Sequence, residues 1–307
     1  MFLGIEIGGT KLQLGLGHGD GRILALWRGA VNAAEGSEGI RKQIEAAVPE
    51  LLAKANADRT QLRGAGIGFG GPTDDASNTV IKSHQIEGWD GFPLADWVSD
   101  LVGVPAVLCN DADVAGLAEA LFGAGKGLSP IFYITVGTGV GGGLIIDGQI
   151  YRGVGRGAAE IGHHVRIWND DGPLRFVTTE DMASGRGIEK RAARYLNLPS
   201  AEGVTTKMVA RLARDGNETA QQILSDATES LAIAIAQMIT LLCPSRVVIG
   251  GGVSLIGEDL FFKPVREKVA AGTFPPFAGL TDIVPAALGE EVVVHGALAL
   301  ARQKFGG

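Results

Sequence analysis

The first 17 residues restrict most strongly what this chain can fold into. An apolar run with one embedded acid, Glu6, leads into Gly8-Gly9-Thr10-Lys11, and a second apolar run, Leu12-Gln13-Leu14, follows at once. Two apolar runs joined by a glycine turn predict a β-hairpin. Because glycine lets a ligand approach the backbone closely, successive N–H groups at the tip of this hairpin can hold a phosphate group.

Glycine accounts for 47 of the 307 residues, which is about double the usual share of roughly 7%. The glycines cluster in turns beside apolar strands, which indicates close backbone approaches rather than disorder. Three further glycine turns follow predicted strands, at Gly70-Gly71, Gly137-Thr138-Gly139 and Gly250-Gly251-Gly252. One such turn alone can be an ordinary hairpin, but two hairpin tips facing each other across a cleft could hold both ends of a triphosphate.

The first half of the chain alternates strands and helices, as in an α/β fold. A helix with apolar residues at helical spacing is expected to be capped by Ser37 and to kink or break at Pro49. The polar segment Thr73–Gly91 is expected to be a binding loop. Further strands are predicted at Arg22–Arg28, Ala65–Phe69 and Ala106–Cys109, and helices at Leu94–Val102 and Ala112–Phe122.

From Ile131 the layout of strand, glycine turn and strand repeats, which predicts two related domains joined near residues 124–130. The tail Glu290–Lys304 is ambiguous, because Val292–Val294 favours a strand and Gly296–Arg302 a helix; we expect a helix. Strands are predicted at Ile131–Thr135, Val140–Asp147, Gln149–Arg152 and Arg246–Ile249, a loop-rich stretch at Gly153–Thr179, and helices at Glu180–Leu196, Lys207–Arg214 and Asn217–Leu242.

Composition and charge narrow the class of protein. With 46% hydrophobic residues the chain can form a sizeable core, and its formal net charge of −7 disfavours a nucleic-acid-binding surface. Cys109 and Cys243 have no CxxC spacing, as expected of reduced thiols in a cytoplasmic protein. Residues 1–8 lack a basic region, so we expect no signal peptide. The longest apolar helical run, Leu231–Cys243, is too short to span a bilayer.

Two familiar nucleotide-binding motifs do not fit. Gly66–Gly71 and Gly137–Gly142 match GxGxxG, but a dinucleotide fingerprint must follow a strand and open a helix. The first match is followed by Pro72 and the second by the strand-like Leu144–Ile146, so a Rossmann site is disfavoured. The P-loop pattern GxxxxGK(S/T) is absent, because Lys126 is followed by glycine.

A carboxylate at a strand end supplies a candidate catalytic group. Asn110-Asp111 lie between a predicted strand and a helix, where α/β proteins build their sites. A second interpretation stays open, in which Asp111 only caps the helix. Glu160 and His163-His164 suit hydrogen bonds to a polyol, although such a loop is also ordinary surface. Structural zinc is disfavoured, because no cysteine lies near this loop and the other histidines are scattered, at His18, His84 and His295.

Six short sequence segments occur in an order and at spacings that can be compared with known families. They are IEIGGTK at residues 5–11, NDAD at 110–113, TVGTGVGGG at 135–143, EIGH at 160–163, ASGRGIE at 183–189 and IGGGVS at 249–254. In order and spacing they resemble the ROK family of sugar kinases, named for repressors, open reading frames and kinases, within the actin/hexokinase superfamily. The resemblance covers essentially the whole chain.

This resemblance implies an α/β fold of two RNase-H-like (actin-like ATPase) domains, whose mixed sheets flank a central cleft. Residues 1–123 with 290–307 would form the N-terminal domain, and residues 124–289 the larger C-terminal domain. It also implies that Gly8–Lys11 and Gly137–Gly139 hold phosphates and that Gly250–Gly252 lie on the adenosine side. Asp111 would be the general base, and sugar hydroxyls would be bound by Gly71, Asn110, Asp111, Glu160, His163 and Glu180.

Three positions depart from the family pattern. Glu6 stands where the family usually has Asp, an acid that helps to hold Mg²⁺ near the phosphates. Arg166–Thr179 contains no cysteine, whereas zinc-bearing members carry a CxCGxxGC cluster there, so His163 would keep only a hydroxyl contact and no zinc site is expected. NDAD replaces the commoner NDAN, and Asp113 could change the field near Asp111.

The implied activity is ATP- and Mg²⁺-dependent phosphorylation of a hexose, glucose-like or an N-acetyl hexosamine, at O6. An alternative is a catalytically weak sensor that binds a sugar or a nucleotide, which Glu6 and the altered loop after His163 suggest. A third possibility is a phosphotransferase that uses another donor, such as polyphosphate, or a non-hexose acceptor. The phosphate hairpin begins almost at Met1, which leaves no room for the helix-turn-helix of the family's repressors. We therefore expect no nucleic-acid or membrane partner, and a homodimer, as is frequent in the family.

Overall fold

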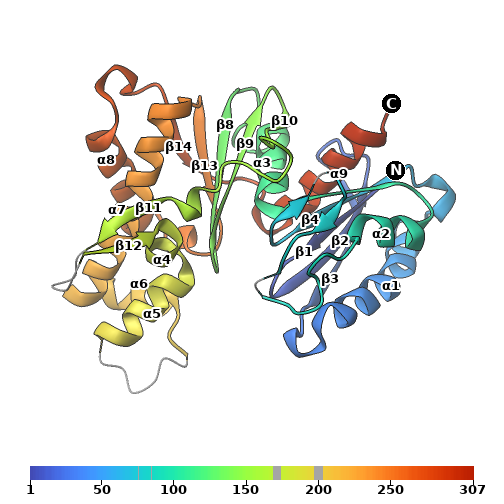
Figure 1. Ribbon diagram of the computed structural model, residues 1–307, viewed down its shortest axis with the longest axis horizontal. Helices are drawn as coiled ribbons and strands as arrows, with labels where there is room; N and C mark the ends of the chain where they lie inside the picture. Colours follow the sequence, from blue (N-terminus) through green and yellow to red (C-terminus); the bar gives the residue numbers. More distant parts are fainter. Residues whose placement is uncertain (75, 84, 169–173, 197–202) are drawn as a thin grey trace. The chain divides into compact units, whose positions relative to one another are not determined.

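The N-terminal hairpin lies in the middle of a five-stranded sheet (Figure 1). In this computed structural model, which describes residues 1–74, 76–83, 85–168, 174–196 and 203–307, the strand order is β3-β2-β1-β4-β7. The strands are β1 (Phe2–Ile7), β2 (Lys11–Gly17), β3 (Ile23–Ala30), β4 (Gly64–Phe69) and β7 (Ala106–Asn110). β1 is antiparallel to β2 and parallel to β4, which is parallel to β7. The carboxyl ends of β1, β4 and β7 therefore share one edge.

Helices cover both faces of this sheet (Figure 1). One face carries α1 (Gly36–Lys54) and α2 (Leu94–Val102), and the other carries α3 (Asp111–Phe122) and α9 (Val292–Phe305). Side chains alternate between the faces along β1. Leu3 and Ile5 belong to the hydrophobic core under α1 and α2, whereas Phe2 packs with Leu298 of α9 on the other face. The predicted C-terminal helix is confirmed, and it includes the ambiguous Val292–Val294.

The face under α9 is built largely from glycine. A Cβ on Gly66 would overlap the carbonyl oxygen of Ala297, and one on Gly4 would lie 3.0 Å from the carbonyl oxygen of Val294. Gly15 and Gly68 likewise leave room for α9 side chains. The helix thus lies directly on the backbone of the sheet, which explains part of the glycine excess and agrees with the predicted close approaches.

A second sheet has the strand order β10-β9-β8-β13-β14. Its strands are β8 (Ile131–Val136), β9 (Val140–Ile146), β10 (Gln149–Ile150), β13 (Arg246–Gly250) and β14 (Asp282–Pro285). β13 is parallel to both β8 and β14. The helices in this half of the chain are α4 (Thr179–Ala183), α5 (Gly185–Tyr195), α6 (Thr206–Arg214), α7 (Glu218–Leu242) and α8 (Lys263–Gly272), and a short hairpin pairs β11 (Val165–Trp168) with β12 (Arg175–Thr178).

The chain forms two units, of which the first contains residues 1–127, 143–158 and 287–307, and the second residues 128–142 and 159–286. Residues 143–158 were expected in the C-terminal domain but contact α3; a Cβ on Gly143, for example, would lie 3.0 Å from Asp113 Cα. The boundaries of the two domains themselves stay a prediction.

A buried carboxylate joins the places where the chain leaves and re-enters the first unit. Glu119 of α3 is fully buried, with 0% exposure. Its Oε2 accepts a hydrogen bond from Ala124 N at 2.7 Å, and its Oε1 accepts from Ala287 N and Leu288 N, both at 2.9 Å. Three backbone donors thus satisfy an acid that would otherwise be costly to bury.

The expectations for α1 were partly wrong. Ser37 does not cap the helix, which begins at Gly36; its hydroxyl instead donates to the carbonyl oxygen of Gly88 at 2.9 Å. The helix also continues through Pro49 to Lys54 without a break. Pro49 is exposed, so water can satisfy the carbonyl group that loses its partner, while the buried side of the helix stays packed.

In the second unit the predicted helix over residues 180–196 is divided. Ser184 has an extended backbone and caps α5 by accepting from Gly187 N at 3.0 Å. The stretch predicted as loop contains the β11–β12 hairpin, and part of that stretch, residues 169–173, lies outside the described residues. The segment Thr73–Gly91 contains a small hairpin of β5 (Thr73–Asp74) and β6 (Thr79–Val80). Neither α8 nor β14 was predicted.

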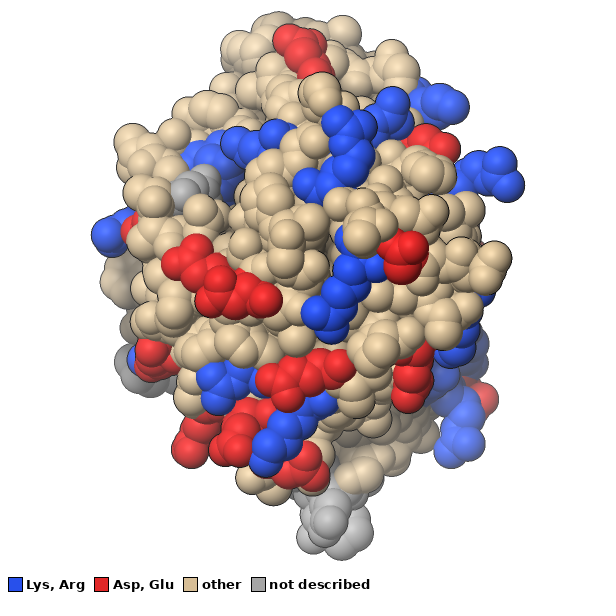
Figure 2. All heavy atoms as spheres, turned by 90° about the vertical axis from the view of Figure 1, so that its right-hand side faces the viewer, with Lys and Arg blue, Asp and Glu red and all other residues tan. Residues whose placement is uncertain are grey.

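None of the described helices combines the length and the apolar character needed to cross a membrane. On the face drawn in Figure 2, Lys and Arg side chains are interspersed with Asp and Glu rather than gathered by sign. This face therefore lends no support to a nucleic-acid footprint, and the absence of a nucleic-acid partner stays a prediction.

Replacing Gly66 by alanine should destabilise the protein by about 2 kcal/mol or more, because the new methyl group meets backbone that cannot rotate away. The free energy of unfolding in urea measures this change. Gly272→Ala, at an exposed end of α8 where a Cβ meets only ordinary contacts, is the control and should change stability by less than about 0.5 kcal/mol. Equal stabilities of the two variants would contradict the close packing of α9.

Candidate active site

Glu6 is a buried carboxylate near the end of β1. It is 5% exposed, with Lys11 Nζ lying 3.0 Å from Oε1, and Oε2 has no hydrogen-bond partner among the described residues. Lys11 Nζ also donates to the carbonyl oxygen of Glu290, at 2.9 Å, just before α9. Burial raises the pKa of Glu6 to about 7, Lys11 opposes this shift, and the charges of Asp111 and Glu290 add to it.

The predicted phosphate turn forms the tip between β1 and β2. Gly8 N donates to the carbonyl oxygen of Lys11 at 3.0 Å, which closes the turn and leaves Thr10 exposed. A Cβ on Gly9 would overlap the side chain of Gln85, so the loop before α2 reaches this tip. Gln85 was not a candidate, since nothing in its polar surroundings marks it in the sequence.

Asn110, rather than Asp111, caps α3. Asn110 Oδ1 accepts from Ala112 N at 2.9 Å and from Asp113 N at 3.4 Å, and Nδ2 donates to the carbonyl oxygen of Gly71 at 3.1 Å. The interpretation of Asp111 as a cap is therefore wrong. Asp111 is the first residue of α3, where the helix dipole favours a negative charge.

The first unit therefore brings one group of candidates together at the shared edge of its sheet. Glu6 lies near the end of β1, Gly71 follows β4, and Asn110 and Asp111 lie at the end of β7. A Cβ on Gly70 would lie 3.4 Å from Asp111 Oδ2, so the turn after β4 lies directly beside this carboxylate.

The second unit holds a similar glycine turn, Gly137–Gly139, between β8 and β9. Gly137 N donates to the carbonyl oxygen of Gly139 at 2.9 Å, and the carbonyl oxygen of Gly137 accepts from Gly185 N at 2.8 Å. Glu180 Oε2 accepts from Val140 N at 2.8 Å. Glu180, a candidate for hydroxyl binding, thus also supports the predicted phosphate turn through one of its two carboxylate oxygens, a role that its sequence position did not suggest.

The glycine turn after β13 fits closely against β8. Gly251 has φ +88°, and a Cβ there would lie 2.5 Å from the carbonyl oxygen of Val136, so only glycine suits this position. Ser254 Oγ donates to the carbonyl oxygen of Gly251 at 2.7 Å. Gly250 and Gly252 flank it, and Gly250 lies beside the hydroxyl group of Tyr133.

Glu160 and His163 are exposed residues at the two ends of one short turn. His163 N donates to the carbonyl oxygen of Glu160 at 3.0 Å. The neighbouring His164 connects this turn to α4, since its carbonyl oxygen accepts from Thr179 N at 2.9 Å. Among the described residues no group of three or more His, Cys, Asp and Glu side chains could hold a metal ion; His84 lies outside them.

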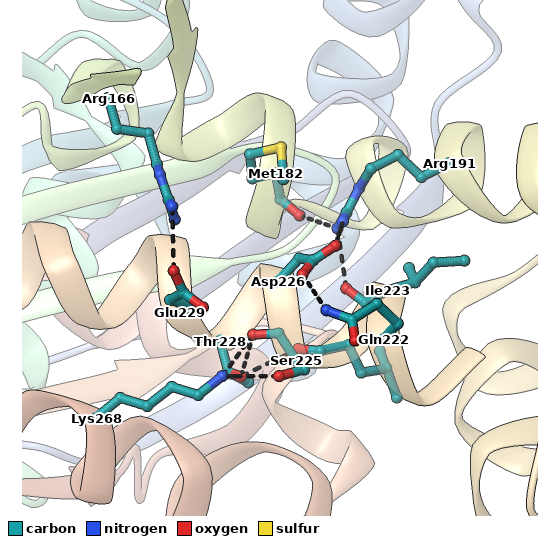
Figure 3. A network of polar contacts seen from close by, with 11 residues as sticks. Arg166, Met182, Arg191, Gln222, Ile223, Ser225, Asp226, Thr228, Glu229 and Lys268 are labelled. Carbon is teal, nitrogen blue, oxygen red and sulfur yellow. Dashed lines mark hydrogen bonds and ion pairs between the residues drawn. The ribbon is translucent and has the colours of Figure 1, made fainter. Parts of the chain in front are cut away.

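A buried polar network connects α4 and α5 to α7 (Figure 3). Arg191 Nη2 donates to the carbonyl oxygen of Met182, at 2.6 Å, and to that of Ile223, at 3.1 Å, while Nη1 lies 3.3 Å from Asp226 Oδ2. Met182 belongs to α4, so Arg191 fixes the short helix that carries Glu180. Burial lowers the pKa of Arg191 and raises that of Asp226, as expected of an ion pair removed from water.

Helix α7 also anchors the β11–β12 hairpin, which follows His163-His164. Arg166 Nη2 on β11 lies 3.1 Å from Glu229 Oε1 on α7 (Figure 3). The side chains of His164 and Gln237 form a second hydrogen bond to α7. These side-chain contacts from α7 therefore help to position the turn of Glu160 and His163.

Comparison with known proteins finds a match to a model of the ROK family over residues 2–304. The chain is 32% identical to a glucokinase of Halalkalibacterium halodurans, over 99% of this chain and 95% of that protein. It is 34% identical to an N-acetylmannosamine kinase of Escherichia coli, over 82% of this chain and 83% of that protein.

Its structure is similar to that of a ROK family glucokinase from Streptomyces griseus in complex with glucose and AMPPNP. The TM-score is 0.79 at 32% identity, covering 98% of this chain and 99% of the other. This similarity and the two mixed sheets confirm the predicted α/β fold class of the actin-like ATPases.

Replacing Glu6 by glutamine should remove a pH dependence of stability. The pKa of Glu6 is about 7 in the folded protein, above its ordinary value of 4.5, so at this group the folded state binds more protons and the contribution of Glu6 to stability falls as the pH rises from 4.5 to 7. Measured in urea without divalent cations, the stability of the glutamine variant relative to wild type should rise by about 3 kcal/mol between pH 4 and pH 8.

Glu50→Gln removes a carboxylate from the exposed side of α1 and serves as the matched control. Its difference from wild type should be the same at both pH values. If the Glu6→Gln variant also keeps a constant difference, the carboxyl group of Glu6 does not titrate near neutrality.

Proposed function

The chain belongs to the ROK family and is an ATP-dependent sugar kinase, and from this premise we propose that it phosphorylates O6 of a hexose with Asp111 as the general base. The acceptor class is glucose-like sugars or N-acetyl hexosamines, in line with the glucokinase and N-acetylmannosamine kinase relatives. The observation that best supports this proposal is that Asn110, rather than Asp111, makes the capping hydrogen bonds at the start of α3.

Because capping does not require Asp111, its carboxylate can accept the proton of the attacking hydroxyl group. The residue is held at the rigid junction of β7 and α3, beside the turn after β4. A base needs such fixed placement, since a general base contributes only when it lies within hydrogen-bond reach of the proton it removes.

Phosphoryl transfer needs positioning and charge stabilisation more than covalent help from the protein. We assign the phosphates to the N–H groups of Gly8–Lys11 and Gly137–Gly139, with the hydroxyl groups of Thr10 and Thr138, and the adenosine side to Gly250–Gly252. Lys11 contributes positive charge, although its ammonium group is already shared between Glu6 and the carbonyl oxygen of Glu290.

The sugar hydroxyls are assigned to two groups of residues. The first unit offers Gly71, Asn110 and Asp111, and the second offers Glu160, His163 and Glu180. Asn110 and Glu180 each use one polar atom to support the backbone, and each keeps further hydrogen-bonding capacity, since a side-chain amide has two N–H donors and a carboxylate two oxygens.

The residues around Glu6 fit a divalent cation. Glu6 Oε2 is buried without a hydrogen-bond partner among the described residues, and Asp111 adds a second negative charge close by. Carboxylate oxygens are the ligands that Mg²⁺ prefers, and it usually keeps several waters. Glu6 would hold Mg²⁺ through water, and bound Mg²⁺ would neutralise charge on the phosphates.

A second candidate function is a sensor that binds sugar or nucleotide with little turnover. It is favoured by one observation, the ion pair of Lys11 with Glu6, because this pair engages an ammonium group that could otherwise face a phosphate. Turnover with Mg²⁺ present distinguishes the two functions.

Asp111→Asn should lower kcat by about 100- to 10,000-fold, because it removes the base but keeps the shape of the side chain. We would measure ADP release with a panel of hexoses and N-acetyl hexosamines, offer polyphosphate as an alternative donor, and identify the phosphorylated oxygen by NMR. Asp100→Asn, on the exposed side of α2, is the control and should keep wild-type rates. Wild-type-like turnover by Asp111→Asn would refute the assigned base, and no turnover by the wild type would favour the sensor.

Glu6→Asp should keep or raise kcat, because the shorter side chain matches the acid usual in the family, whereas Glu6→Ala should abolish Mg²⁺-dependent turnover. A displacement of about 1 Å can change a rate by roughly a hundredfold. The dependence of kcat on Mg²⁺ concentration measures both effects. Full activity of the alanine variant would show that Glu6 does not serve the metal.

A further inference from the structure

A second carboxylate lies close to Asp111 in sequence and is even more deeply buried. Asp113 occupies the first turn of α3 and is 2% exposed. A buried carboxylate is stable only when it is paired or hydrogen-bonded. Arg152, whose side chain is 14% exposed, forms an ion pair with Asp113 Oδ2 through Nη1. The extra negative charge of the NDAD segment is thus compensated inside the first unit.

Arg152 makes another contact with its other terminal nitrogen. Nη2 donates to Thr73 Oγ1 at 3.2 Å, and Thr73 is 1% exposed. The planar guanidinium group therefore links the first turn of α3 to the segment that follows β4. The guanidinium group makes the two contacts from separate nitrogens in a fixed plane, whereas a lysine would have to make both from one nitrogen.

The segment that contains Thr73 also passes beside the proposed base. Gly70 lies beside Asp111 Oδ2, and the carbonyl oxygen of Gly71 accepts from Asn110 Nδ2. Residues 70–74, called the β4–β5 turn here, are therefore held by Asn110 at one end and by Arg152 at the other. Both anchors come from segments far away in sequence.

A second arginine offers a natural comparison. Arg156 Nε lies 3.2 Å from Asp74 Oδ2, so it also connects residues 151–156 to the β4–β5 turn. Its side chain, however, is 73% exposed, and ion pairs at such positions contribute little. Asp74 is in addition held by hydrogen bonds from the backbone N–H groups of Ala76 and Ser77.

From this arrangement we propose that Arg152 is a positioning residue for sugar binding, which fixes the β4–β5 turn against the first turn of α3 and so sets the place of the sugar relative to Asp111. The proposal rests on the kinase function proposed above. Arg152 acts through Thr73 and Asp113 and need not touch the sugar.

The test separates positioning from stability. Arg152→Met should raise the KM for the sugar by about 10- to 100-fold, leave the KM for ATP unchanged, and lower the Tm, because Asp113 loses its cation. Adding Asp113→Asn to this variant should restore the Tm but not the KM for the sugar. Thr73→Val keeps the ion pair and should by itself raise the KM for the sugar.

Arg156→Met is the matched control and should keep wild-type kinetics. The dissociation constant of the sugar, measured by calorimetry, should follow the same pattern and does not depend on turnover. If the wild type binds sugar without phosphorylating it, the kinase function fails while the binding data still decide the role of Arg152. Unchanged sugar affinity in both Arg152→Met and Thr73→Val, recovery of affinity in step with Tm in the double variant, or no sugar binding by the wild type would overturn the proposal.

Discussion

The first unit depends on direct contact between α9 and the backbone of its sheet. Glycines such as Gly66 and Gly4 remove the side chains that would hold the helix away. The start of the helix is thereby brought to the N-terminal hairpin, where the carbonyl oxygen of Glu290 accepts from Lys11 Nζ and from Gln13 Nε2. The orientation of Lys11, and with it the environment of Glu6, is therefore a product of packing at the far end of the sequence.

Both units place their candidate residues by the same rule. Parallel strands end at a common edge, and glycine turns or helix starts follow directly. In the first unit this edge collects Glu6 and Asp111, and in the second it collects the turns after β8 and β13. Burial raises the pKa of Glu6 and the charges of Asp111 and Glu290 add to this shift, while the charge of Asp113 is compensated by Arg152.

Local patterns were enough to predict most strands and helices, because apolar periodicity reports which side of an element is buried. The glycine hairpin, α3 and α7 follow this rule. Contacts between distant segments leave no such trace: Arg152 and Asp113 are 39 residues apart, and the bracing of Val140 by Glu180 depends on the folded position of α4. The division at Ser184 was missed for the same reason, since the hydrogen bond from Gly185 N to Gly137 that accompanies it is a tertiary contact.

The position of α9 in the sequence also has a consequence for the order of synthesis. The strands of the first sheet are all made before residue 111, but the helix that covers their glycine face spans Val292–Phe305. The whole second unit, residues 128–142 and 159–286, is translated in between. The part of this face that α9 covers therefore stays open on the ribosome until the second unit has been synthesised, and the site at the edge of the sheet can be completed only after translation has passed α9.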